Sequence, residues 1–499
     1  MEKNNKKSIL NILLDLILFF GSFLVMAVRW VFSYFSNVSI DTVLLQMTKS
    51  LEGTDSKIVL DGIIGICVFG FLIYFIIKFI YFIFKKFILK DKSKNIYETI
   101  YLILIIIIFI TYVLVRSDIV GYADAKNTDS DFFEKHYTEP SNVKITFPEE
   151  KKNLIYIILE SMEVSFMDEE NSGVMDKDLI PEITKLQKEN ISFSDKENAL
   201  GGPFNFEGVD CTIASLVAQS TGIPLYLVDN EDNEKLTEAD NFLNSYYTLG
   251  DVLEDNGYNQ VFMCGSESRF AGRGTFYRNN GNYKIYDYTY VIKNRIKKDD
   301  NYAPWGLYDY ELYEHAKDEL LRLSKENKPF NLTMLTVDTH HMDGTVCKNC
   351  LMVHGPLEQY KNVMSCASRQ VNSFINWIKK QEFYDDTVIV VVGDHPSMSS
   401  TFDEYYSKDY DKKTVNFFIG SSNKPINTNK RDFTVLDLYP TTLSAMGANI
   451  EGDRLGLGTN LFSNKKTIPE EVGKEFFKEE LRKNSEFYNN LVSETMGEK

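Results

Sequence analysis

Positive charge is scarce in this chain, which holds 54 Lys and Arg against 71 Asp and Glu and carries a formal net charge of −17. A protein that binds nucleic acid needs a basic surface to neutralise phosphates, so this balance predicts no nucleic-acid partner. Internal repeats and low-complexity tracts are also missing. With 44% hydrophobic and 25% charged residues, the composition excludes a disordered or fibrous protein.

The excess of acidic over basic residues is confined to the part of the chain after residue 120. Residues 1–120 hold 13 basic and 9 acidic side chains, whereas the remainder holds 41 basic and 62 acidic. The first part also contains three long apolar runs, and a helix needs roughly 20 residues to cross a hydrocarbon core of about 30 Å. The first run is too long for a signal peptide, and two more follow it. Residues 1–116 therefore predict a transmembrane domain with spans at about 8–30, 62–84 and 99–115.

Lysines are concentrated in two of the segments that flank these spans. Three precede the first span, and five lie between the second and third, namely Lys85, Lys86, Lys90, Lys92 and Lys94. Short cytoplasmic loops of membrane proteins are rich in Lys and Arg, so we expect a cytoplasmic N-terminus. Three crossings of the cell (inner) membrane then place everything after Arg116 on the extracytoplasmic side. Asp15 and Lys78 lie within spans, where we expect them to be paired or snorkelling rather than functional.

Cysteine is scarce as well, with six residues in the chain. Cys67 lies in a span, and the exported part holds the other five, namely Cys211, Cys264, Cys347, Cys350 and Cys366, so at least one of them stays unpaired. Cys347-x-x-Cys350 has the spacing of half a zinc site, but no second Cys pair or His pair completes that motif. In an oxidising compartment we favour a disulfide from Cys347 or Cys350 to Cys366, and the full pairing stays open.

The exported part alternates short apolar runs with helical stretches. We expect a connector over residues 117–150, a catalytic domain over 151–463 and a charged C-terminal surface helix or tail over 464–499. Continuous apolar strands separated by helices indicate an α/β domain with a mostly parallel sheet covered on both faces. The expected strands are Leu154–Leu159, Gln260–Cys264, Phe330–Val337, Thr387–Val392 and Asn416–Ile419. The expected helices are Pro181–Asn190, Ile213–Ser220, Asn244–Asn256, Tyr308–Glu326, Met364–Lys380 and Val435–Met446.

Titratable residues follow three of the expected strands. Glu160 ends the first, His340 and His341 follow the strand that contains Leu335, and Asp394 and His395 end another. In open α/β sheets the functional site lies beyond the carboxyl ends of the strands. Polar residues at strand ends often cap the next helix, but three of only six histidines fall in this pattern. Two carboxylates with a histidine make a suitable ligand set for a divalent metal ion.

The residues alone allow two roles for Thr212. It directly precedes the helical run that begins at Ile213, where a threonine is a common N-cap. A helix N-terminus also attracts anions, so a metal-activated Thr212 hydroxyl there would be a nucleophile facing a phosphate. Spacing alone does not establish which role applies, although by itself it favours the N-cap.

Several segments resemble a known family. They are Asn153-Leu-Ile-Tyr-Ile-Ile-Leu-Glu160-Ser, Cys211-Thr212-Ile-Ala-Ser-Leu-Val-Ala-Gln with Gly222-Ile-Pro-Leu, Gly250-Asp-Val-Leu with Gly257-Tyr, Arg269-Phe-Ala-Gly272, Leu335-Thr-Val-Asp-Thr-His-His341, Gly393-Asp-His395 and Leu455-Gly-Leu-Gly458. Together, and in this order, they resemble the membrane phosphoglycerol transferases of the alkaline phosphatase/sulfatase superfamily, which include membrane-derived oligosaccharide phosphoglycerol transferases and lipoteichoic acid synthases. The resemblance covers residues from about 150 to 462 and implies a sulfatase-like fold for the exported domain.

The resemblance also implies roles for individual residues. Glu160, Thr212, Asp394 and His395 match the ligands of one divalent metal ion, usually Mn²⁺, with Zn²⁺ or Mg²⁺ as alternatives. Thr212 matches the nucleophile, and His340 matches a histidine that contacts the phosphoglycerol group.

The substrate loop is matched less closely. Phe276-Tyr-Arg278 is similar to an aromatic-x-Arg element in which the ring packs on glycerol and the guanidinium binds phosphate. Arg273 is the alternative phosphate ligand, and His341 would support the metal ligands from behind.

The implied reaction is transfer of phosphoglycerol from phosphatidylglycerol to an envelope glycan or a polyglycerolphosphate chain, through a phosphothreonine-type intermediate. A phosphoethanolamine transferase is one alternative, and a phosphodiesterase or sulfatase is another. Sulfatases of this superfamily need a Cys/Ser-x-Pro-x-Arg motif, whereas Cys211 is followed here by Thr-Ile-Ala-Ser. A catalytically silent membrane binding protein is the remaining alternative, and the presence of all four matched ligands argues against it. The sequence does not specify the acceptor.

Overall fold

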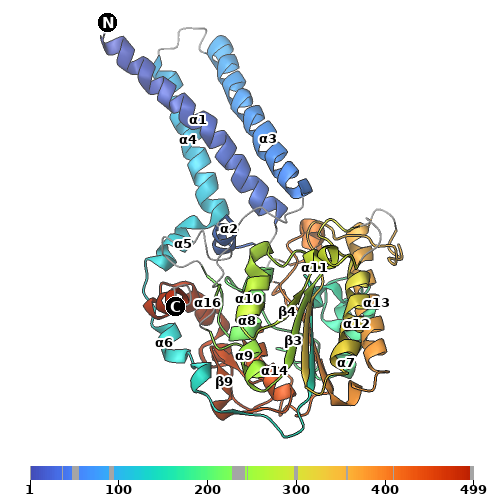
Figure 1. Cartoon of the computed structure of the whole chain (residues 1–499). Helices are drawn as coiled ribbons and strands as arrows, with labels where there is room; N and C mark the ends of the chain where they lie inside the picture. Colours follow the sequence, from blue (N-terminus) through green and yellow to red (C-terminus); the bar gives the residue numbers. More distant parts are fainter. Residues whose placement is uncertain are drawn as a thin grey trace. The chain divides into compact units, whose positions relative to one another are not determined.

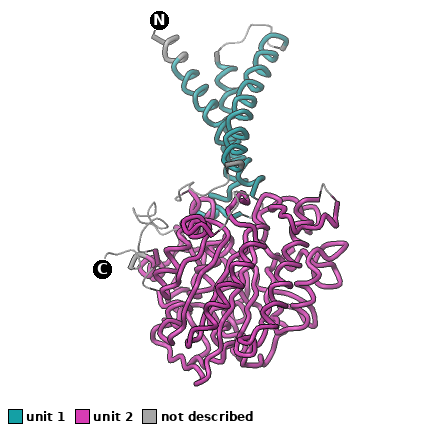
Figure 2. Tube along the Cα trace, turned by 45° about the vertical axis from the view of Figure 1, so that its right-hand side comes forward, with its two compact units in different colours: residues 1–40, 54–124 teal, residues 41–53, 125–499 magenta. Residues whose placement is uncertain are grey.

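The computed structural model describes residues 2–35, 38–47, 56–88, 95–226, 242–243, 246–296, 302–355, 358–407 and 410–494. The chain divides into two compact units (Figures 1 and 2). The first unit comprises residues 1–40 and 54–124, and the second comprises residues 41–53 and 125–499.

The first unit consists of long apolar helices. They are α1 (Glu2–Tyr34), α3 (Ser56–Ile83) with a π-helical turn over Phe84–Ile88, and α4 (Asn95–Ser117), followed by the start of α5 (Ile119–Lys126). Three stretches are long and apolar enough to cross a membrane: Ile9–Tyr34, Ile58–Phe87 and Ile96–Ser117. The three predicted spans coincide with these helices.

Two charged side chains inside the predicted spans, Asp15 and Lys78, are paired with each other. Lys78 Nζ lies 2.8 Å from Asp15 Oδ1, and the hydroxyl of Tyr74 donates a hydrogen bond of 3.0 Å to Asp15 Oδ2. A charge placed in lipid is costly unless it is neutralised. This contact is the paired arrangement expected from the sequence.

The second unit is built on a six-stranded sheet. Its strand order is β4 (Lys284–Tyr286), β3 (Asn259–Cys264), β5 (Phe330–Leu335), β2 (Asn153–Leu159), β6 (Thr387–Gly393) and β7 (Asn416–Ile419). All neighbouring pairs are parallel except β6 with β7. The predicted α/β domain with a mostly parallel sheet is confirmed. In the central register, Ile158 is paired with both Leu335 and Val392, so the carboxyl ends of β5, β2 and β6 lie side by side.

Helices cover both faces of this sheet (Figure 1). Ile158 and Val390 face a core shared with α8 (Thr212–Thr221), α9 (Leu249–Asp255) and α14 (Leu438–Ala445). Ile157 and Val391 face the opposite core, shared with α7 (Pro181–Glu189), α12 (Asp309–Leu323) and α13 (Gln359–Ile378). Because successive strand residues point to opposite faces, a sheet covered twice needs apolar side chains at every position. This requirement explains the uninterrupted apolar runs.

Smaller elements complete the second unit. They are α2 (Ile40–Met47, from Asp41 onward), α6 (Phe132–His136), α10 (Arg273–Asn279), α11 (Tyr288–Lys293), β1 (Ile145–Thr146) paired with β8 (Asn449–Ile450), and β9 (Arg454–Leu455) paired with β10 (Gly458–Thr459). The α2 segment packs into the same core as α8 through Leu45, and Thr42 Oγ1 donates a 2.5 Å hydrogen bond to Asp210 Oδ1. A stretch between two predicted spans therefore belongs to the second unit.

The C-terminal segment differs from the expected surface helix or tail. It forms α15 (Ile468–Val472), α16 (Lys474–Arg482) and α17 (Glu486–Glu494), and Phe477 and Tyr488 join the core that contains α8. The hydroxyl of Tyr488 donates a 3.1 Å hydrogen bond to the carbonyl of Pro224. Most of the scattered apolar positions of this segment thus lie on the buried faces of amphipathic helices.

Adjacent phenylalanines of α16 provide a matched test of this packing. Phe477 is 1% exposed and Phe476 is 50% exposed. We expect Phe477→Ala to lower the free energy of unfolding by about 3–5 kcal/mol, because it leaves a cavity in the core. Phe476→Ala should change it by less than about 1 kcal/mol. Urea unfolding of the detergent-solubilised protein, followed by Trp fluorescence, measures both, and equal effects would contradict the packing.

Candidate active site

Three metal-ligand candidates meet at the carboxyl edge of the sheet. Glu160 directly follows β2, and Asp394 and His395 follow β6, its parallel neighbour. One ligand atom from each residue lies within 4.8 Å of the others, and all three side chains are buried. His395 Nε2 is 3.6 Å from Glu160 Oε1 and 3.4 Å from Asp394 Oδ2.

Hydrogen bonds orient these side chains and leave one atom of each facing inward. Asp394 Oδ1 accepts hydrogen bonds of 2.8 Å from the backbone N–H groups of Ser161 and His395, whereas Oδ2 is buried without a hydrogen-bond partner. His395 Nδ1 lies 2.8 Å from the carbonyl of Pro396, so it carries the proton and leaves the Nε2 lone pair for the site. A buried carboxylate oxygen without a hydrogen-bond partner, beside an imidazole nitrogen that carries a lone pair, fits a divalent cation.

The proximity of the three groups shifts their pKa values. Burial, reinforced by the charge of Glu160, raises the pKa of Asp394 to about 7. Burial acts to lower the pKa of His395, but the carboxylates of Asp394 and Glu160 outweigh it and the pKa is raised. Burial acts to raise the pKa of Glu160, but His340 and His395 outweigh it and the pKa is lowered. Without a cation, the cluster therefore retains a proton near neutral pH.

This retained proton predicts how metal affinity depends on pH. A cation must displace the proton, so we expect affinity for Mn²⁺ to rise by about tenfold per pH unit below pH 7 and to level off above it. Titration calorimetry from pH 5.5 to 8, in two buffers with different ionisation enthalpies, measures both the affinity and the protons released. An affinity that stays constant over this range, with no proton release, would contradict the coupling.

Thr212 joins this group from the start of α8. Its Oγ1 lies 3.3 Å from Glu160 Oε2 and 3.3 Å from His395 Nε2. The N-cap position belongs to Cys211 and Thr212 is the first helical residue, so the N-cap role favoured by spacing alone is wrong. Ser215 Oγ donates a 2.6 Å hydrogen bond to the carbonyl of Asp394 and ties α8 to the end of β6. The half-buried Thr212 hydroxyl is thereby held against two of the ligand candidates.

The loop after β5 brings His340 to the same edge. Thr339 Oγ1 donates a 2.6 Å hydrogen bond to the carbonyl of Glu160, which joins this loop to the end of β2. His340 is half-buried, and its Nδ1 lies 2.7 Å from the carbonyl of His341. Its charge acts on Glu160, as the lowered pKa of that carboxyl records. His341 is buried behind it.

The predicted substrate loop is placed differently. Phe276 is 0% exposed and lies in the core that contains α8, so its ring is not available to pack on glycerol, and this part of the prediction is wrong. Arg278 is exposed in the last turn of α10. Arg273 is buried, and its Nη2 donates hydrogen bonds of 3.0 Å to Ser266 Oγ and to the carbonyl of Glu267.

An aromatic residue that the sequence analysis did not select lies beside His340. The Trp305 ring centroid is 4.4 Å from that of His340 and 5.9 Å from that of Phe270. Trp305 is half-exposed, so it offers an apolar surface at the site. The signal for Trp305 in the sequence is that tryptophan is rare, with only three in the chain.

A parallel sheet with this ligand group and a helix-initiating hydroxyl at its carboxyl edge defines a protein of the alkaline phosphatase/sulfatase class. A family model described as Sulfatase matches residues 152–448. The chain belongs to the sulfatase family.

Individual relatives extend the comparison. Phosphoglycerol transferase I of Escherichia coli O139:H28 is 31% identical over 447 residues, which cover 86% of this chain and 54% of the relative. Phosphoglycerol transferase I of Shigella boydii serotype 18 is 32% identical over 348 residues, which cover 68% of this chain and 42% of the relative. The chain spans about half the length of the curated relatives it matches.

Among solved structures, a lipoteichoic acid synthase from Listeria monocytogenes is similar, with a TM-score of 0.49, 19% identity and coverage of 67% of this chain and 81% of that one. A lipooligosaccharide phosphoethanolamine transferase A from Neisseria meningitidis has a TM-score of 0.48, 14% identity and coverage of 88% and 84%.

Proposed function

We propose that this protein is a membrane phosphotransferase that moves phosphoglycerol from phosphatidylglycerol to an acceptor hydroxyl. The observation that carries the proposal is the position of Thr212 Oγ1, at the start of a helix and 3.3 Å from atoms of both Glu160 and His395. The matched phosphoglycerol transferases support the choice of transferred group. The apolar helices of the first unit support a lipid donor.

Glu160, Thr212, Asp394 and His395 would hold one divalent cation, for which we propose Mn²⁺, with Zn²⁺ or Mg²⁺ as alternatives. When bound, such a cation lowers the pKa of a coordinated hydroxyl and neutralises charge on phosphate oxygens. The orphaned Oδ2 of Asp394 and the inward Nε2 of His395 supply two of the positions such an ion requires. Their burial keeps competing water away.

The transfer takes two steps on the residues of this chain. Thr212 Oγ1 releases its proton to solvent and forms a bond to phosphorus, while the bond from phosphorus to the diacylglycerol oxygen breaks. That oxygen leaves with a proton supplied by the imidazolium of His340, whose Nδ1 is held by the carbonyl of His341. In the second step an acceptor hydroxyl attacks the phosphorus of the phosphothreonine and gives its proton to His340. The bond from phosphorus to Thr212 Oγ1 breaks, and that oxygen takes up a proton from solvent.

The first turn of α8 assists both steps. A helix of ten residues presents free N–H groups and a partial positive charge at its N-terminus, and both stabilise a phosphate. Trp305 and His340 would flank the glycerol moiety, and Arg273 or Arg278 of α10 would bind phosphate. His341 would support the ligands from behind. The acceptor is an envelope glycan or a polyglycerolphosphate chain.

The predicted membrane topology suits this reaction. We propose three crossings of the cytoplasmic membrane, a cytoplasmic N-terminus and a catalytic unit on the extracytoplasmic side. Tethering to the bilayer raises the effective concentration of a lipid donor. Residues 117–150 would connect the membrane domain to a catalytic domain over 151–463. The C-terminal helices pack on that domain.

Donor discrimination tests the proposal. Purified protein in proteoliposomes with Mn²⁺ is supplied with phosphatidylglycerol or phosphatidylethanolamine, each labelled in the head group. We expect diacylglycerol release from phosphatidylglycerol to exceed that from phosphatidylethanolamine by at least about a hundredfold, a discrimination within reach of specific polar contacts. Preference for phosphatidylethanolamine would favour the phosphoethanolamine alternative. Release of free glycerol phosphate in the presence of acceptor would favour a hydrolase.

A further inference from the structure

Three thiols meet in the second unit outside the active-site residues. Cys347 and Cys350 lie in the loop that follows β5, and Cys366 lies in α13. Cys347 Sγ is 3.4 Å from Cys350 Sγ and 3.8 Å from Cys366 Sγ, and all three sulfurs lie within 4.8 Å of one another. Cys347 and Cys366 are buried, and Cys350 is half-buried. The disulfide expected to Cys366 is not formed, since all three thiols are free.

The spacing of these sulfurs suits a shared metal ion. Zinc–sulfur bonds of about 2.3 Å in tetrahedral geometry place two sulfurs about 3.8 Å apart. A disulfide joins only two sulfurs, at about 2.05 Å, and would leave the third thiol buried beside the bond. The third ligand was missed in the sequence because Cys366 lies 16 positions after Cys350 and comes from a helix rather than a second Cys pair.

Neighbouring N–H groups donate hydrogen bonds to these sulfurs. Gln370 Nε2 donates hydrogen bonds to Cys366 Sγ at 3.2 Å and Cys347 Sγ at 3.4 Å, and the backbone N–H of Cys347 donates to Cys350 Sγ at 3.3 Å. Such N–H···S contacts stabilise thiolate ligands.

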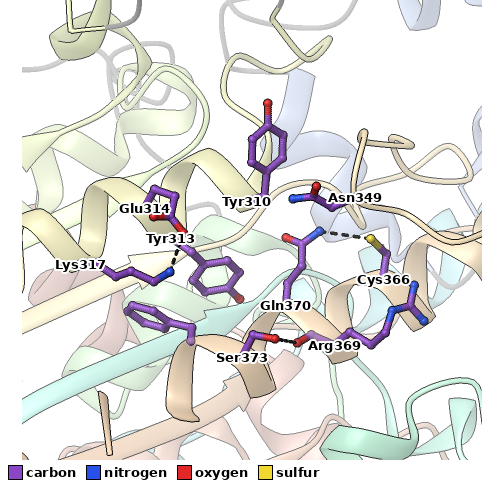
Figure 3. Close-up of a pocket in the computed structure, with 10 residues that line it drawn as sticks. Tyr310, Tyr313, Glu314, Lys317, Asn349, Cys366, Arg369, Gln370 and Ser373 are labelled. Atoms are coloured by element: carbon purple, nitrogen blue, oxygen red, sulfur yellow. Dashed lines mark hydrogen bonds and ion pairs between the residues drawn. The ribbon is translucent and has the colours of Figure 1, made fainter. Parts of the chain in front are cut away.

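A cavity of about 230 Å³ adjoins the thiols (Figure 3). Lys317, Asn349, Arg369 and Gln370 line it together with Cys366. Three thiolates with one divalent cation carry a net charge of −1, which the cationic side chain of Arg369 complements, whereas Lys317 is paired with Glu314. Of the three cysteines, Cys366 lines the cavity, which is large enough to hold water.

We propose that Cys347, Cys350 and Cys366 bind a zinc ion that fastens the loop after β5 to α13. Thiolate ligands select zinc over manganese or magnesium, which prefer oxygen. The same loop carries His340 and His341, and Tyr360 of α13 already donates a 3.1 Å hydrogen bond to the carbonyl of Thr339. The ion therefore fixes the path of the segment that carries these histidines. The inference does not depend on which group the active site transfers.

Metal analysis of the purified full-length protein tests the site. Protein from zinc-supplemented cells is stripped of loosely bound ions and analysed for zinc and thiols. We expect about one zinc per chain and six titratable thiols after unfolding without reductant. The Cys350→Ser and Cys366→Ser variants should each retain less than a tenth of the zinc. Cys67→Ser, at an exposed position of α3, and Glu160→Gln, in the active site, should retain it.

A cobalt measurement keeps the proposal testable if a cysteine variant fails to fold. Wild-type protein reconstituted with Co²⁺ should show near-ultraviolet absorption from thiolate-to-cobalt charge transfer, and it should persist in Glu160→Gln. Zinc-free wild-type protein with four titratable thiols would overturn the proposal in favour of a disulfide. Cobalt-loaded protein without the thiolate band would overturn it as well.

Discussion

Replacing Thr212 with alanine is expected to reduce diacylglycerol release from phosphatidylglycerol by at least about a thousandfold, because it removes the hydroxyl that attacks phosphorus in the proposed reaction. Thr212 Oγ1 is the hydroxyl that contacts both Glu160 Oε2 and His395 Nε2. The fold should tolerate the change, since Cys211 rather than Thr212 occupies the N-cap of α8. Head-group release in Mn²⁺-loaded proteoliposomes measures the loss, and circular dichroism checks the fold.

Thr212→Ser is the matched control for this substitution. It keeps the hydroxyl and removes only a methyl group, so we expect turnover within about a hundredfold of wild type, far above that of the alanine variant. Mass spectrometry of wild-type protein quenched without acceptor should find phosphoglycerol on the peptide that contains Thr212. Full turnover in Thr212→Ala would remove Thr212 as the nucleophile and leave attack by water as the simpler mechanism.

Most of the sheet was predictable because burial on both faces imposes a simple pattern. The expected strand Asn416–Ile419 matches β7, and the expected strand Thr387–Val392 falls one residue short of β6. The predicted boundaries were wrong where side-chain hydrogen bonds, rather than the pattern of apolar residues, decide where an element begins. The expected helix Asn244–Asn256 begins at Leu249, because Thr248 and Asp251 form a capping box there. Residues 244 and 245 of that range lie outside the described residues.

The active site was predictable to the extent that it follows strand ends. Glu160, Asp394 and His395 come together because β2 and β6 are parallel neighbours whose last residues, Leu159 and Gly393, are paired. No comparable rule predicts which loops contact one another. The packing of Trp305 on His340 joins segments whose approach depends on the whole fold, and local spacing does not encode it.

The burial of Phe276 and the contact between Cys366 and Cys347 could not be predicted, for the same reason. In each case a tertiary contact decides whether a side chain faces the core, a ligand or another chain segment. A motif of a few residues contains no information on that choice. Thr212 shows the converse, since the family resemblance identified its position and the local helix-capping argument pointed to the wrong role.

Substituting Asp394 by asparagine should separate metal binding from stability. Asparagine keeps an oxygen for the N–H groups of Ser161 and His395, which Oδ1 accepts in wild type, but removes the charge from Oδ2. Loss of an outer partner of a metal ligand already costs about 10–100-fold in affinity, so we expect a loss of at least about a hundredfold for Mn²⁺. The increase in melting temperature that Mn²⁺ produces in wild type should then disappear.

The metal-free Asp394→Asn protein should melt at or above the temperature of the metal-free wild type at pH 8. Burial raises the pKa of Asp394 to about 7 from an ordinary 3.8, so its ionisation destabilises the metal-free fold progressively as pH rises above 3.8. Asp437→Asn is the control, because Asp437 is equally buried and its pKa is also raised to about 7 by burial. That variant should keep the Mn²⁺-dependent shift, and an unchanged shift in Asp394→Asn would remove Asp394 from the metal site.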